Sequence, residues 1–116
     1  MPNEIALSTR ATHKFISIKK RTGLAPNILL RVALLKALEM NIAPTKLEIP
    51  ESLSQKIPKD VAFGEYSEVF NYGIREYVEN YSYKGDAKEL ITRLVETGSY
   101  KIANIKKFQD LGVLFY

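Results

Sequence analysis

Residues 8–40 read STRATHKFISIKKRTGLAPNILLRVALLKALEM and carry the strongest helical signals in the chain. In the first half of this stretch, apolar side chains recur at steps of four and three and predict one buried helical stripe, formed by Ala11, Phe15 and Ile18. Gly23 supplies the left-handed residue that ends such a helix. Pro26 suits the first turn of a second helix, because that position needs no backbone N–H donor. The stretch therefore predicts two consecutive helices, over 9–22 and 26–40.

The second of these predicted helices is apolar on nearly every side. Only three of its positions are charged, and they are Arg31, Lys36 and Glu39. A helix with so few polar positions must be covered on most of its surface. Either it lies at the centre of a monomeric bundle, or a second subunit supplies part of the cover. The sequence leaves both interpretations open.

The segments on either side predict short extended pieces. Residues 4–8 alternate between polar and apolar side chains, which is typical of a short strand or an extended N-terminal arm. Residues 41–63 contain three prolines among polar side chains and predict a long surface connection. Within it, residues 46–49 predict a brief extended piece.

Three further helices are predicted within residues 64–112. The first carries a long apolar stripe between Tyr66 and Tyr81. The second begins at Asp86, which has a glutamate three positions on and so forms a capping box, and it ends at Gly98. The third begins at Ser99. Its expected buried positions and its stop are Ile102, Ile105, Phe108, Leu111 and Gly112.

Together these patterns predict an all-α fold of about five helices with a short extended N-terminal arm. We expect a single domain over residues 1–116, because a chain of this length supports one hydrophobic core. Its parts are the basic helices of residues 9–40, the proline-rich connection of residues 41–63 and the C-terminal helices of residues 64–112.

The inventory of residues excludes several classes of function. The chain has no cysteine, which excludes disulfides, thiolate metal sites, iron–sulfur clusters and thiol nucleophiles. Its single histidine, His13, is too few for a histidine-rich metal site. No nucleophile elbow and no phosphate-cradling glycine loop occurs. We therefore expect a protein that is not an enzyme, with no catalytic residues, no metal and no cofactor.

Membrane and export signals are not visible either. The uninterrupted apolar runs are far shorter than the roughly 20 residues that a membrane-spanning helix needs. The N-terminus lacks the basic segment and long apolar core of a secretory signal. We expect a cytoplasmic protein without a membrane partner.

The charge is divided along the chain, although the net charge is only +4. Residues 5–38 contain seven basic residues and no acidic one. Residues 39–96 hold eleven acidic residues against seven basic ones. This division favours a surface that binds a polyanion over a basic helix face that is merely solvated.

A polar row follows one side of the helix predicted over 9–22. Its members recur at steps of four, three and four, and they are Arg10, Lys14, Ser17 and Arg21. Lys20 and His13 project from the back of the same helix, and Lys19 lies on its other flank. The row is about 16 Å long, which spans several phosphates of one strand. Because nothing in this geometry reads base edges, we expect backbone binding with little sequence preference.

Two further positions of the basic stretch join the expected nucleic-acid site. The second helix begins beside Asn27, where backbone N–H groups could bind one phosphate. Arg31 follows one turn later. An alternative location for the site is the C-terminal basic group of Lys101, Lys106 and Lys107.

Two blocks of sequence carry a resemblance to a known family. They are KKRTGLAPNILLRVAL at 19–34 and FGEYSEVF at 63–70. In order and spacing they resemble the DndE family of DNA sulfur-modification proteins, over residues 4–115. The resemblance implies a small helical accessory protein of the DNA phosphorothioation system, which replaces a non-bridging phosphate oxygen with sulfur.

The resemblance also implies partners. In that system the sulfur chemistry belongs to a cysteine desulfurase and to an iron–sulfur enzyme that uses nucleotides. The implied role of this chain is to bind DNA, including nicked duplex, through lysines on the surface of a homo-oligomer, a dimer or a tetramer. By position that role maps onto Lys14, Lys19 and Lys20. Arg10 and Arg21 are added from the helical geometry alone.

Two other functions stay open. The first 40 residues also resemble a ribbon-helix-helix repressor, in which paired strands enter the major groove and read an operator. The strand residues that would face the bases are Glu4, Ala6 and Ser8, which offer few long side chains. The other alternative is an assembly subunit that binds partner proteins through its apolar second helix and does not contact DNA.

Overall fold

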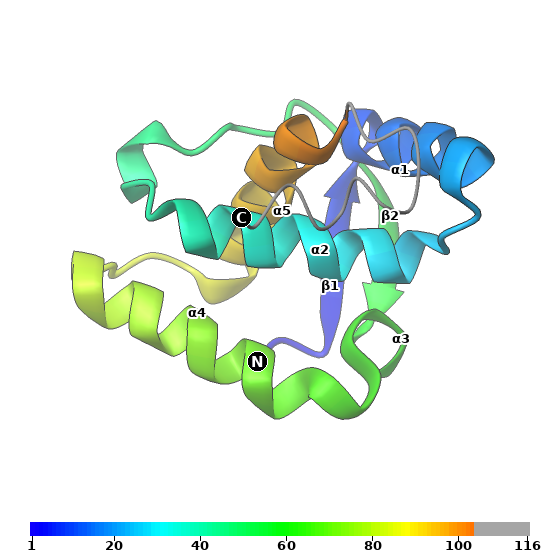
Figure 1. The fold of residues 1–116 in the computed structure, drawn as a ribbon. Coiled ribbons are helices and arrows are strands. Elements are labelled where there is room, and N and C mark those ends of the chain that lie inside the picture. The colour runs from blue at the N-terminus through cyan, green and yellow to red at the C-terminus, as the bar shows by residue number, and fades with distance from the viewer. Residues whose placement is uncertain (104–116) are drawn as a thin grey trace.

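The computed structural model describes residues 1–103 (Figure 1). Its elements in chain order are β1 (Glu4–Ser8), α1 (Thr9–Thr22), α2 (Pro26–Met40), η1 (Pro44–Lys46), β2 (Leu53–Pro58), α3 (Lys59–Phe63), η2 (Gly64–Tyr66), α4 (Ser67–Tyr81) and α5 (Ala87–Ile102). No helix among these is long and apolar enough to cross a membrane.

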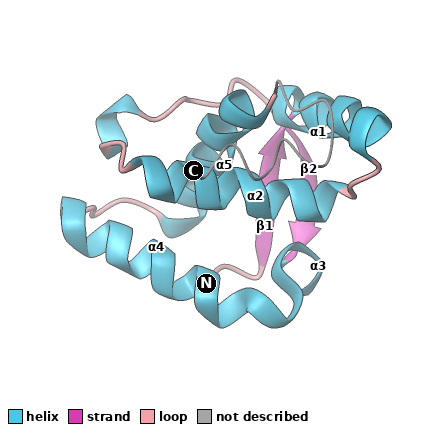
Figure 2. Ribbon diagram, viewed as in Figure 1, coloured by secondary structure: helices cyan, strands magenta, loops and turns pink. Residues whose placement is uncertain are grey.

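The predicted all-α fold is wrong, because the described chain is mainly helical but also contains a two-stranded antiparallel sheet (Figure 2). In the sheet, β1 pairs with β2 from Glu4 opposite Pro58 to Ser8 opposite Leu53. The sequence of β2 does not alternate in burial, since only Ile57 is buried and the other five positions are exposed. A strand with one inward side chain lacks the period-two signal by which strands are recognised.

The N-terminal half has the strand-helix-helix order of the ribbon-helix-helix resemblance, but its strand does not pair as the strand of such a repressor would. The partner of β1 is a strand of the same chain, and Ala6 and Ser8 are each only 2 % exposed. Thr92 of α5 donates a hydrogen bond to the Ala6 carbonyl at 2.9 Å. Since β1 is packed between β2 and α5, its side chains are not presented to a DNA groove.

Residues 41–63 form more than a surface connection. They contain η1, β2 and α3, and the strand begins at Leu53, later than the extended piece expected at residues 46–49. Within that expected piece Leu47 is buried, whereas Ile49 is 74 % exposed and lies outside any strand.

The helices over 9–22 and 26–40 are confirmed by α1 and α2. Ser8 caps α1 by accepting a hydrogen bond from the Ala11 backbone N–H at 2.9 Å. Gly23 ends the helix in the left-handed conformation, at φ 78°. The second helix begins at Pro26, as its sequence predicts.

The centre of the fold is α2, which lies between the other helices (Figure 1). Its fully buried face is covered within the chain by α1, α3, α4 and α5, and consists of Leu29, Leu30, Ala33, Leu34 and Ala37. Of the two interpretations of this apolar helix, the described residues favour the central helix of a bundle for that face. Leu35, on another side of α2, remains 44 % exposed.

One predicted helix boundary is wrong. The capping box at Asp86 begins α5, where its carboxylate accepts from the Glu89 N–H at 3.0 Å. The helix then continues through Gly98 and Ser99 to Ile102. Gly98 serves a close approach of two helices, because a Cβ there would lie 1.8 Å from the Ala33 carbonyl oxygen of α2. The remaining predicted positions, Ile105, Phe108, Leu111 and Gly112, lie outside the described residues.

Candidate nucleic-acid interface

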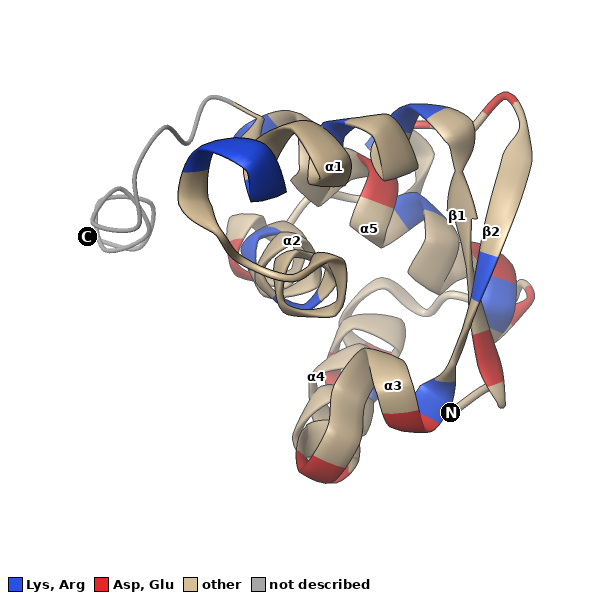
Figure 3. Ribbon diagram, turned by 90° about the vertical axis from the view of Figure 1, so that its right-hand side faces the viewer, with Lys and Arg blue, Asp and Glu red and all other residues tan. Residues whose placement is uncertain are grey.

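The basic residues of α1 lie along the outer side of the molecule (Figure 3). The helix contains five of them and no acidic residue, and they are Arg10, Lys14, Lys19, Lys20 and Arg21. Lys14 is partly buried and the other four are exposed. The buried stripe of Ala11, Phe15 and Ile18 turns this basic side away from the core, as predicted.

Two cations of the predicted row gather on one aromatic ring of α5. The Lys14 ammonium nitrogen lies 3.6 Å from the centre of the Tyr100 ring. The Arg10 guanidinium carbon lies 5.9 Å from the same centre, and its Nη1 donates a hydrogen bond to the Tyr100 hydroxyl. Such cation–π contacts hold charged side chains in place while leaving their charge intact.

Burial of Lys14 beside this ring lowers the pKa of its ammonium group, and the nearby Glu96 carboxylate partly opposes that shift. Glu96 itself is only 2 % exposed and accepts a hydrogen bond from the Ser8 hydroxyl. Because Ser8 also caps α1, this buried pair ties the start of the basic helix to α5.

Arg10 also forms an ion pair with Glu51, at 3.5 Å. Both side chains are largely exposed, and ion pairs of that kind contribute little stability. A phosphate that approached Arg10 would therefore compete with a weakly held carboxylate.

At the far end of the row, Arg21 joins α1 to the end of α5. Its Nη1 donates to the Ser17 hydroxyl at 2.9 Å, and its Nη2 donates to the Ala103 carbonyl at 2.8 Å. The three cations of the row, Arg10, Lys14 and Arg21, thus all contact the C-terminal end of α5.

The remaining two cations, Lys19 and Lys20, are exposed at the C-terminal end of α1. Within residues 1–103 neither side chain forms a hydrogen bond or an ion pair. Their ammonium groups are accordingly hydrated, and a phosphate could displace that water without breaking an internal contact.

Asn27 and Arg31 face a different neighbour from the α1 row. Arg31 donates from Nε to the Ala62 carbonyl at 2.7 Å, and Asn27 donates from its side-chain amide to the Val61 carbonyl at 3.3 Å. Both residues hold the end of α3 against α2. The structure does not bring these two predicted residues into the row on α1.

Lys101 follows Tyr100 on α5 and is exposed. The other members of the alternative basic group, Lys106 and Lys107, lie outside the described residues. Across residues 1–103 no group of histidine, cysteine, aspartate or glutamate side chains is arranged to hold a metal ion.

Sequence reasoning did not place Tyr100, Glu51 or Glu96 at this surface. Tyr100 lies 90 positions from Arg10, and Glu96 lies 88 positions from Ser8. No periodicity connects residues that far apart, so only the packing of α5 against α1 and β1 could have revealed them.

The sequence and the fold of the chain are both similar to those of known proteins. The family model for the DNA sulphur modification protein DndE matches residues 4–110. The chain belongs to the DndE family. No curated protein sequence matches the chain significantly.

Two solved structures of DndE are similar in fold. The crystal structure of DndE from Escherichia coli B7A, which is involved in DNA phosphorothioation modification, has a TM-score of 0.71 and 22 % identity, covering 88 % of this chain and 97 % of that one. A glycine-to-lysine mutant of DndE involved in DNA phosphorothioation has a TM-score of 0.67 and 21 % identity, covering 88 % of this chain and 98 % of that one. The resemblance inferred from the two sequence blocks is thereby confirmed.

Proposed function

We propose that this DndE-family protein is a non-catalytic accessory protein of a DNA phosphorothioation system, and that it binds duplex DNA, nicked duplex included, through backbone phosphates along α1. The observation that carries the proposal is the exposure of Lys19 and Lys20 at the end of a helix that contains five basic residues and no acidic one. The positive charge that α1 carries attracts a polyanion, and no acidic residue of the helix itself opposes it.

Phosphate contacts explain both the affinity and the low sequence preference that we propose. Lysine and arginine bind phosphate oxygens by charge-assisted hydrogen bonds, which position the DNA without reading its bases. If the five cations of α1 engage three to five phosphates, the logarithm of the binding constant falls with the logarithm of salt concentration at a slope of about −3 to −4.5.

An assembly with other copies and other proteins is the second part of the proposal. A homo-oligomer, dimer or tetramer, would repeat the α1 face and raise the affinity for one DNA molecule by avidity. Leu35 on α2 and Ile16 on α1, which are 44 % and 43 % exposed, offer apolar surface for such a contact. The further partners are the sulfur-transferring proteins of the same system, and the proposed compartment is the cytoplasm.

A binding titration over several salt concentrations tests the proposal. Fluorescence anisotropy would compare nicked duplex, intact duplex and single strands of unrelated sequence. We expect binding to each duplex at low salt, with similar affinity for unrelated sequences and a steep salt dependence. A strong preference for one sequence, or no binding at low salt, would contradict it.

Light scattering tests the assembly separately. A homo-oligomer has a mass well above the 13.2 kDa of one chain. A monomer at micromolar concentration would contradict the oligomer and leave the DNA titration as the test of the α1 surface.

A further inference from the structure

The face of the molecule opposite α1 carries acidic residues (Figure 3). Exposed apolar side chains lie among them. Residues 59–81, which form α3, η2 and α4, contain two basic residues and five acidic ones. The acidic residues are all exposed, and they are Asp60, Glu65, Glu68, Glu76 and Glu79. None of the four ion pairs among the described residues involves them.

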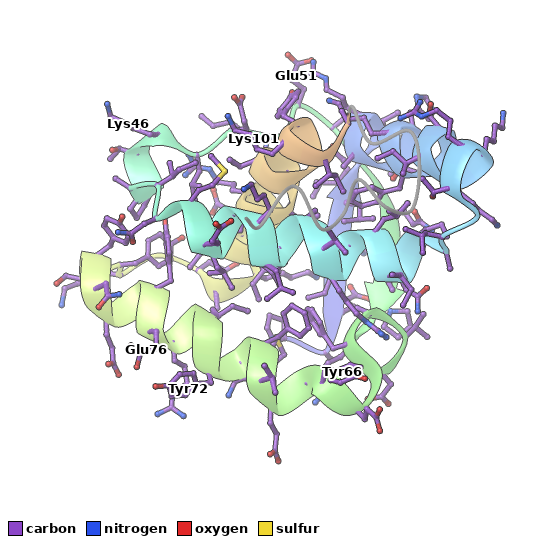
Figure 4. All side chains as sticks on the ribbon, in the orientation of Figure 1. Lys46, Glu51, Tyr66, Tyr72, Glu76 and Lys101 are labelled. Carbon is purple, nitrogen blue, oxygen red and sulfur yellow. The ribbon has the colours of Figure 1, made fainter. Side chains whose placement is uncertain are left out.

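An apolar ridge runs through these acidic residues. Val69 is 64 % exposed and Tyr72 is 66 % exposed. Val69, Tyr72 and Glu76 follow one another along α4 at steps of three and four and so lie on one side of the helix. Figure 4 shows Tyr72 and Glu76 pointing away from the body of the molecule. The opposite side of α4 carries the buried residues Phe70, Ile74 and Tyr77, so the fold does not use the ridge.

The ridge extends toward α3. Tyr66 is 49 % exposed and Val61 is 52 % exposed. The Arg31 guanidinium carbon lies 5.7 Å from the centre of the Tyr66 ring, a cation–π contact that holds this ring in place before any partner arrives. Contiguous exposed apolar side chains rimmed by charge are typical of protein–protein contacts, in which tyrosine is enriched.

We infer that the ridge of Val69 and Tyr72 is a docking surface for a protein partner whose contacting surface is basic and has an apolar groove. The argument for that chemistry is complementarity. The acidic rim attracts lysine and arginine side chains and repels nucleic acid and anionic lipid. An amphipathic helix such as α4 docks by placing anchors three and four residues apart in a groove.

This assignment gives the two sides of the protein different ligands. DNA phosphates would be repelled from α4, and a basic protein would be repelled from α1. The proposal does not depend on DNA binding, because it concerns different residues on the opposite face. The chain would then connect a DNA backbone with a basic protein.

The test uses the full chain and two synthetic helical peptides. The first peptide is a helical hairpin with a leucine-lined groove bordered by lysine and arginine, and the control peptide has glutamate in place of every basic residue. We expect the basic peptide to bind the wild type and the control peptide not to bind. Val69→Ser with Tyr72→Ser should weaken binding of the basic peptide roughly tenfold, since two anchors are lost.

The matched control is Ile49→Ser with Leu53→Ser. These residues are 74 % and 59 % exposed and lie outside the ridge, so this variant should bind the basic peptide like the wild type. All four positions are exposed, and thermal unfolding should be unchanged in both variants. DNA affinity should also be unchanged in the Val69 and Tyr72 variant.

Three results would overturn the proposal. One is equal binding of the basic peptide to the wild type and to the Val69 and Tyr72 variant. Another is equal binding of the two peptides. The third is a fall in mass by light scattering for the Val69 and Tyr72 variant alone, which would assign the ridge to a second copy of this chain.

Discussion

The Lys14 ammonium nitrogen lies 3.6 Å from the centre of the Tyr100 ring, so the middle of the basic helix rests on the last turn of α5. The same tyrosine accepts a hydrogen bond from Arg10. Two cations that the helical spacing places side by side are therefore held in position by a residue from the other end of the described chain. An ordered pair of cations loses less side-chain freedom when a phosphate binds.

Replacing Tyr100 with alanine should weaken DNA binding a few-fold. Cation–π contacts at exposed to partly desolvated sites are worth about 0.5–2 kcal/mol, and their loss frees both cations to move. The slope of affinity against salt should stay the same, because the number of positive charges does not change. Tyr100→Phe keeps the ring under Lys14 and loses only the hydroxyl, so its DNA affinity should lie between that of the wild type and that of Tyr100→Ala. Anisotropy titrations at several salt concentrations measure both quantities, and an alanine variant that binds like the wild type would disprove the role of the ring.

Gly98→Ala should destabilise the fold. The added Cβ would lie 1.8 Å from the Ala33 carbonyl oxygen, so α5 would have to move away from α2. Overpacking of this kind costs about 1–3 kcal/mol or more. Urea unfolding followed by circular dichroism measures the cost.

Gly73→Ala is the matched control, the same substitution within α4. There the nearest neighbour of the added Cβ is the end of the flexible Leu38 side chain, at 3.2 Å. In a helix interior, alanine is also more favourable than glycine by about 1 kcal/mol. We expect a stability equal to or above that of the wild type. Equal losses for the two variants would show that the contact between Gly98 and Ala33 is not special.

Glu4 should make stability depend on acidic pH. Its carboxylate accepts a hydrogen bond from Lys88 at 3.1 Å and lies 3.8 Å from the Lys56 ammonium nitrogen. The Lys88 contact, with a smaller share from Lys56, lowers the pKa of Glu4 from the ordinary 4.5. Because the pKa of Glu4 is lower in the folded state than in the unfolded state, the ionised carboxylate stabilises the fold at any pH above the unfolded-state pKa. This contribution is lost as the pH falls through the folded-state pKa.

Glu4→Gln should therefore be less stable than the wild type near neutral pH, and the difference should close as the pH falls below 4.5. Urea unfolding at a series of pH values measures it. The control is Glu79→Gln, at an exposed residue that forms none of the ion pairs among the described residues. A difference between wild type and Glu4→Gln that is constant across pH would contradict this explanation.

Local signals were enough to predict the main helices. A stripe of apolar residues, a serine at the start and a glycine at the end define α1, and Pro26 and Asp86 mark the starts of α2 and α5. The sheet could not be predicted in this way. Its second strand turns only Ile57 inward, and pairing with β1 joins segments that are about fifty residues apart. In the sequence alone, Gly98 looks like a glycine that ends a helix. Only the close approach of α2 shows that it is instead a contact between two helices.

In the candidate site, too, local features could be predicted from the sequence and long-range contacts could not. The exposure of Lys19 and Lys20 follows from the position of the buried stripe on their own helix, and it could be predicted. The surroundings of Arg10 could not, because Glu51 and Tyr100 come from a loop and a helix far along the chain. Arg31 belongs to the basic N-terminal stretch of sequence, but its long-range contact with the Ala62 carbonyl turns its side chain toward α3 and not toward the row on α1.

The most direct test of the central claim is the salt dependence of DNA binding by the double variant Lys19→Ala with Lys20→Ala. The matched control is Lys46→Ala with Lys84→Ala, which removes two exposed lysines from other parts of the surface. We predict that the first variant loses affinity equally for unrelated sequences and that its slope against salt becomes shallower by about 2, while the control keeps the wild-type slope. An unchanged slope in the first variant, or an equal change in both, would show that DNA does not bind along α1.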